Sequence, residues 1–72
     1  MNMAELSEEY RDSAALCRDR ARALRLWLNE EALTQTERML LKRRINMLSE
    51  MAADAGAIAK YLRRYYVRKE AS

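Results

Sequence analysis

The sequence predicts an all-α protein: an antiparallel two-helix hairpin with coiled-coil-like packing, which dimerises into a four-helix bundle. Three observations support this fold class. The 72 residues include no proline and one glycine, and alanine, leucine, arginine and glutamate, which favour helices, are abundant. Apolar residues recur at helical spacing in two long segments. A connection of about five residues separates these segments, which forces the helices to lie antiparallel in a single domain, residues 1–72.

The first helix is expected over about residues 3–28. Asn2 can cap it, with Glu5 three residues later, although the helix would start near Ser7 if the first turn frays. A second, shorter apolar flank, about 120° from the main seam, consists of Leu16, Ala23 and Trp27. The main seam has steps of three and four residues, close to the coiled-coil period, and comprises Met3, Leu6, Tyr10, Ala14, Cys17, Ala21, Leu24 and Leu28.

The turn is expected at residues 29–33. Asn29 can adopt the left-handed conformation that often ends a helix. Thr34 and Glu37 have the spacing of a capping box, in which each side chain binds the backbone amide of the other residue. With this turn, facing residues have numbers that sum to about 65, which pairs Cys17 with Leu48.

The second helix is expected over about residues 34–68, and its apolar stripe covers roughly 160°, more than the ~100° of a helix that rests on one core. A helix of this kind needs at least two neighbours. The central line of the stripe is Leu41, Leu48, Ala55 and Leu62, and one flank is Ile45, Ala52, Ala59 and Tyr66. The other flank is Leu40, Met47, Met51, Ile58 and Tyr65. Around Gly56 the helix carries its smallest residues, which either allow close approach of Tyr10 or are simply tolerated at the surface.

Self-association is the remaining route to stability for a chain of this size. A single core rarely supplies more than ~3–5 kcal/mol in so small a scaffold. Cys17 is the only cysteine and histidine is lacking, so we expect no intrachain disulfide, no metal site and no cofactor. The expected interface combines the outer flanks of both helices: Leu16, Trp27, Leu40, Met47, Met51, Ile58 and Tyr65.

The charge is distributed unevenly. Residues 1–31 carry five basic and seven acidic side chains, whereas residues 32–72 carry nine basic and four acidic ones. The hairpin brings the acidic start towards the basic end, so the two are expected to neutralise each other. The alternative is nucleic-acid binding, because cations bind phosphates and tyrosines stack on bases, through Lys60, Tyr61, Arg63, Arg64 and Arg68. A stripe of Arg11, Arg18, Arg22 and Arg25 is interpreted as an ordinary solvated face.

Enzymatic activity, a small-molecule substrate and membrane insertion are not expected. Neighbouring carboxylates such as Glu30 and Glu31 would need a cleft and shifted pKa values for acid–base catalysis, and a hairpin offers no obvious cleft. Cys17 falls in the seam, where it behaves as a small hydrophobe. Charges interrupt every apolar run, and the first residues do not resemble a secretory signal, so we expect a cytoplasmic protein.

The segments 10–16, 24–28, 44–48 and 61–66 resemble a group of short helical-hairpin proteins of gut-type Firmicutes. That resemblance implies the hairpin fold and no particular activity. Another family of short hairpins, the sporulation-control aspartyl-phosphate phosphatases, carries Ser-Gln-x-Leu-Asp on its second helix. This chain has Ser49-Glu50-Met51-Ala52-Ala53 instead, so that activity is not carried over. The function we expect is a protein–protein interaction or adaptor module that acts as a homodimer or higher homo-oligomer.

Overall fold

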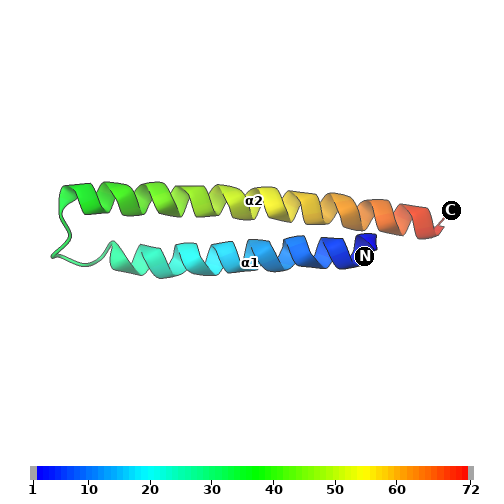
Figure 1. The fold of residues 1–72 in the computed structure, drawn as a ribbon, viewed down its shortest axis with the longest axis horizontal. Helices are drawn as coiled ribbons and strands as arrows, with labels where there is room; N and C mark the ends of the chain where they lie inside the picture. Colours follow the sequence, from blue (N-terminus) through cyan, green and yellow to red (C-terminus); the bar gives the residue numbers. More distant parts are fainter. Residues whose placement is uncertain (1, 72) are drawn as a thin grey trace.

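A computed structural model shows an antiparallel hairpin of two helices, α1 (Met3–Trp27) and α2 (Gln35–Ala71) (Figure 1). It describes the backbone of residues 2–71 and the side chains of residues 2–65. The molecule is a rod of 58 × 16 × 13 Å, with the turn at one end and both termini at the other (Figure 1). The predicted hairpin is confirmed. The helix bounds differ by one residue at the turn, and α2 continues three residues beyond the predicted end at residue 68.

The start of α1 follows the expected capping chemistry. The side-chain oxygen of Asn2 accepts a hydrogen bond of 2.8 Å from the backbone amide of Glu5. This bond satisfies one of the amides that the first turn of a helix leaves without a partner. The helix therefore begins at Met3 rather than near Ser7.

The predicted left-handed residue at Asn29 is wrong. No non-glycine residue in the described part of the chain has a positive φ. Instead α1 tightens as it ends, with amide-to-carbonyl bonds that span three residues from Leu28 to Arg25 and from Asn29 to Leu26. Such bonds satisfy carbonyls of the last turn of a helix without a left-handed residue.

Arg38 holds the turn from the opposite helix. Its guanidinium Nη1 donates a 2.7 Å hydrogen bond to the carbonyl of Leu28, and Nη2 donates a 2.8 Å bond to the carbonyl of Glu30. Carbonyls at the end of a helix need partners, and a cation is a strong donor to them. Arg38 therefore anchors the carbonyls of the turn just beyond the end of α1.

The capping box at the start of α2 is confirmed. The Thr34 hydroxyl accepts a 3.1 Å bond from the Glu37 amide, and the Glu37 carboxylate accepts a 3.0 Å bond from the Thr34 amide. The hydrogen bond from the Thr34 backbone, with a further contribution from the Thr34 side chain, lowers the pKa of Glu37 below its ordinary value of 4.5. The folded state therefore favours the ionised form of the Glu37 side chain.

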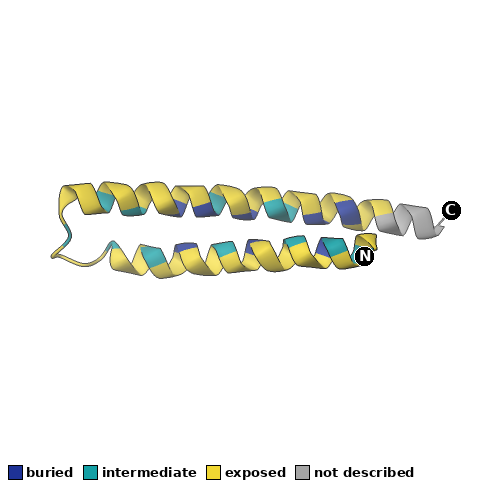
Figure 2. Cartoon of the chain, in the orientation of Figure 1, coloured by how far each residue is buried: buried dark blue, intermediate teal, exposed yellow. Residues whose placement is uncertain are grey.

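The core is a narrow line between the helices (Figure 2). Ala21, Ile45 and Leu48 form its centre, with Cys17 and Leu24 packed against them. Nearer the termini, the buried hydroxyl of Ser7 donates a 2.9 Å hydrogen bond to the carbonyl of Ala59. The Ser7–Ala59 bond and the packing of Cys17 against the cluster that contains Leu48 agree with the predicted register of about 65.

One detail of the predicted packing needs correction, an open choice at Gly56 is decided, and Tyr66 is not tested. Met3 is exposed, and the buried residue of that turn is Ser7, because small side chains let the helices approach along the line 7, 14 and 21. Gly56 makes no close contact: a Cβ added there would meet nothing within 4 Å. The surface interpretation of this glycine is therefore right. Tyr66, predicted for the stripe, lies outside the described side chains.

Candidate functional site

The candidate site is an exposed apolar surface along one edge of the hairpin. Helix α2 buries one of its two predicted flanks, at Ile45, Ala52 and Ala59, and its central line is buried or half-buried. The other flank remains at the surface, as does the second flank of α1. We call these residues the apolar edge; their exposed fractions run from 41% to 70%, and they are Leu16, Trp27, Leu40, Met47, Met51, Ile58 and Tyr65.

Helical geometry brings both flanks to the same edge. When an antiparallel pair of helices is viewed from one end, successive residues turn clockwise around one helix and anticlockwise around the other. Arg18 and Ser49, one from each helix, line a common hollow at one edge. At 100° per residue, Met51 projects from α2 on the side opposite to Ser49, and Trp27 projects from α1 on the side opposite to Arg18. The apolar residues of both helices therefore share the second edge.

The accessible area of the hairpin is large for its mass. The chain exposes 6087 Å² for a mass of 8.5 kDa, whereas a compact monomer of this mass exposes about 4,700 Å². The difference of about 1,400 Å² for one chain exceeds the ~800 Å² that each partner buries in a standard protein–protein interface. Half-exposed methionine, isoleucine and leucine side chains account for part of this area and are available for burial.

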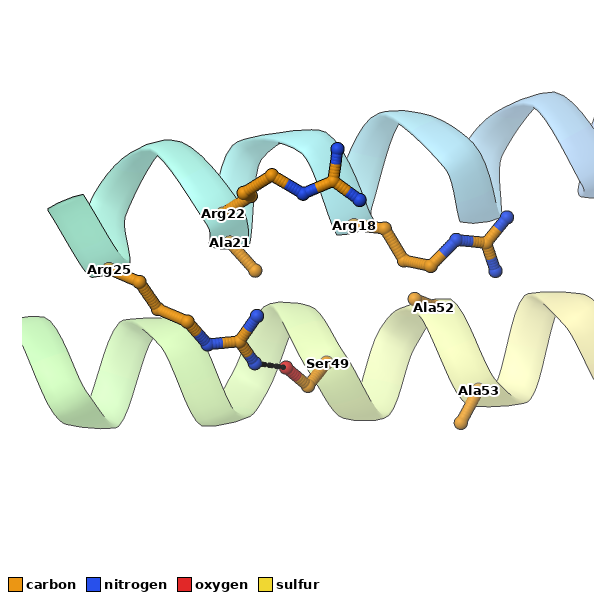
Figure 3. Close-up of a pocket in the computed structure, with 7 residues that line it drawn as sticks. All are labelled: Arg18, Ala21, Arg22, Arg25, Ser49, Ala52 and Ala53. Carbon is orange, nitrogen blue, oxygen red and sulfur yellow. Dashed lines mark hydrogen bonds between the residues drawn. The ribbon is translucent and has the colours of Figure 1, made fainter.

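The other edge is basic and hollowed. One hollow of about 350 Å³ lies over Ala21 and Ala52 and is bordered by Arg18, Arg22 and Arg25 (Figure 3). A second hollow of about 250 Å³ lies nearer the termini and shares Arg18 with the first. We call the two together the basic groove; its cations are Arg11, Arg18, Arg22, Arg25, Lys60 and Arg63.

Within residues 2–65, most of the groove cations have no hydrogen-bond or ion-pair partner. Nη2 of Arg25 donates a 3.2 Å hydrogen bond across the groove to the Ser49 hydroxyl (Figure 3). Arg22 lies 4.0 Å from Asp19 of its own helix, an exposed ion pair that contributes little. The expected neutralisation of the basic end by the acidic start of α1 is not found, since residues 2–65 contain no ion pair between the helices. The acidic side chains lie mainly on the outer face of α1, away from α2.

The predicted C-terminal nucleic-acid cluster is divided by the structure. Lys60 and Arg63 line the basic groove. Tyr61 and Arg64 are exposed but do not line it, and Arg68 lies outside the described side chains. Tyr61, the tyrosine of the cluster, therefore does not line the groove with Lys60 and Arg63.

Other chemistry has little support in the described residues. No three histidine, cysteine, aspartate or glutamate side chains among residues 2–65 are grouped so that they could hold a metal ion. Cys17 is half-buried against the core, as its place in the seam predicts. In the described part of the chain, neither helix contains an apolar stretch that could cross a membrane.

Comparison with protein-family models, with curated proteins and with solved structures finds no match to this chain. The candidate function therefore rests on the two edges of the hairpin.

The basic groove is the feature that sequence reasoning missed. The arginine stripe of α1 was visible in the sequence. The register of about 65 places Arg63 level with the start of α1, so only the structure shows that Lys60 and Arg63 line a hollow with Arg11 and Arg18. The bonds of Arg38 to the turn have no signal in the sequence pattern, because they depend on the path of residues 28–34.

Proposed function

We propose that this protein is a non-enzymatic protein–protein interaction module that acts as a homo-oligomeric helical bundle, in its simplest form a homodimer of hairpins. The observation that carries the proposal is the apolar edge, where seven large apolar side chains from both helices stay exposed. Water-soluble monomers rarely gather this many exposed large apolar side chains on one edge without a partner for them.

A second copy is the partner that fits this edge best. Two hairpins pack as a four-helix bundle when each presents an apolar stripe along its whole length, and this edge runs from Leu40 near the turn to Tyr65 near the termini. Methionines such as Met47 and Met51 adapt their shape to a facing helix. Burial of the edge would also offset the limited core of a single hairpin.

The test is the molar mass in solution, measured by sedimentation equilibrium over a hundredfold range of concentration. The proposal expects a dimer, or a higher oligomer, that persists at low micromolar concentration. A chain that stays monomeric at every concentration would refute it. In that case the apolar edge would be left for a helix of a different protein.

A further inference from the structure

We propose that the basic groove binds the phosphate backbone of a nucleic-acid duplex without regard to base sequence. The groove is distinct from the apolar edge. Its charge, its shape and its lack of aromatic lining residues favour a nucleic-acid duplex as the ligand. The inference does not depend on self-association.

The lining of the groove is strongly basic. Six cations line the groove and no acidic side chain does. All six are exposed, so their charged ends reach solvent and are able to meet a ligand. Protein–protein interfaces are depleted of charge at their centre, whereas neutralisation of phosphates by arginine and lysine is the main source of affinity for nucleic acids.

The shape of the groove suits the backbone of a ligand better than a large side chain. The floor of the groove consists of small residues: Ser7, Ala14, Ala21, Ala52, Ala53, Gly56 and Ala59. A floor of this kind has no deep socket for the large aromatic or aliphatic anchors that dominate binding between proteins. It does allow a ligand backbone to come close while the arginines on its border reach around it. Arg11 and Arg25 lie fourteen residues apart on α1, about 21 Å along the helix, which corresponds to about six base pairs of a duplex.

The absence of aromatic residues from the groove lining selects a duplex over a single strand. Proteins that bind single strands stack the bases on aromatic side chains. Tyr61, which is exposed, does not line the groove, and Tyr65 belongs to the apolar edge on the other side of the hairpin. Contacts from the groove are therefore limited to phosphates, which carry no direct sequence information.

Two matched triple variants test the proposal. The groove variant carries Arg11→Gln, Arg18→Gln and Arg63→Gln, which removes three cations that make no hydrogen bond or ion pair within residues 2–65. The control variant carries Arg20→Gln, Arg43→Gln and Arg64→Gln, which removes the same charge from exposed positions outside the groove. Circular dichroism verifies that both variants keep the helical content of the unmodified protein.

Binding is measured by fluorescence anisotropy with labelled duplex DNA of about 20 base pairs and two unrelated sequences, at about 50 and 200 mM salt. We expect the unmodified protein to bind both sequences equally and to lose affinity steeply with salt. The groove variant should bind at least tenfold more weakly, and its slope of log affinity against log salt should be smaller by about 2–3. The control variant should stay within about threefold of the unmodified protein.

Four results would overturn the proposal. They are a lack of binding at about 50 mM salt, an equal loss in both variants, a loss confined to the control variant, and tighter binding to polyglutamate than to DNA at equal charge concentration. The third result would favour the C-terminal cluster around Arg64. The fourth would indicate an acidic protein as the occupant.

Discussion

Met51 lies in the middle of the apolar edge. Its replacement by glutamate should weaken self-association and leave the folding of the single hairpin nearly unchanged. The residue is 50% exposed in the single hairpin. Complete burial of a methionine side chain is worth about 1.5–3 kcal/mol, so the half that remains exposed offers about 0.75–1.5 kcal/mol to a dimer. A symmetric dimer contains two copies, which doubles the loss to about 1.5–3 kcal/mol.

The charge adds to this loss, because a carboxylate in an apolar interface has no partner for its negative charge. We therefore expect Met51→Glu to weaken dimerisation at least 100-fold. Folding of the single hairpin should change little, because glutamate favours helices about as well as methionine and the position is half in water.

Met39→Glu is the matched control. Met39 is 53% exposed and projects from the opposite side of α2, away from both α1 and the apolar edge. Sedimentation equilibrium of the three proteins at matched concentrations measures the dissociation constants. The reasoning is refuted if Met51→Glu associates as tightly as the unmodified protein, or if Met39→Glu weakens association to the same degree.

Four further predictions concern the turn, the caps and Gly56. Thr34→Ala should cost about 1 kcal/mol in a urea melt, because the cap of α2 is lost; no change would place the stabilising contacts elsewhere. Since folding lowers the pKa of Glu37 below 4.5, its contribution is present above that pH and is lost as the pH falls through the folded-state pKa. Glu37→Gln should keep the cap and lower the acid sensitivity of thermal unfolding, and an unaltered pH profile would contradict this. Arg38→Met should cost about 1.5 kcal/mol, because the carbonyls of Leu28 and Glu30 lose a charged donor; urea denaturation with unchanged stability would assign the turn another anchor. Gly56→Ala should stabilise the hairpin by about 1 kcal/mol, since the added methyl group meets nothing within 4 Å, and a lower melting temperature would show that the site is crowded.

The hairpin and its caps could be predicted because they depend on residues close together in the sequence. Thr34 and Glu37 are three positions apart, and their capping box forms as the pattern requires. The apolar edge was predictable for a related reason: a stripe of roughly 160° is too wide for one antiparallel neighbour, so one of its flanks had to remain exposed. The flank with Ile45 was buried and the flank with Met51 was not, and the register alone does not decide that choice.

Features that depend on contacts between distant residues were not predictable in this way. Asn29 is a residue type that often ends a helix in the left-handed conformation. Here the last turn closes with three-residue backbone bonds, Arg38 binds the carbonyls beyond it from the next helix, and no left-handed residue is needed. The small residues around Gly56 indicated either close packing or a tolerated surface, and only the position of α1 decides between them. The ion pairs expected between the acidic and basic ends depend on side-chain direction, because Glu8 and Asp12 point away from α2 although their helix lies beside it.

The arrangement of the two edges allows both proposals to hold at once. The apolar edge, which carries Met51 and Ile58, and the basic groove lie on opposite edges of the hairpin. When two copies pair through their apolar edges, their basic grooves therefore face outward, in opposite directions. Self-association therefore leaves Arg18 and Arg63 exposed to a ligand. It also directs the two grooves of a dimer in opposite directions, so that one straight duplex could not occupy both. A dimer would bind two duplex segments, whereas a monomer would bind one. The ratio of duplex to protomer at saturation is thus the same in both states, but only a dimer would join two duplexes into one particle.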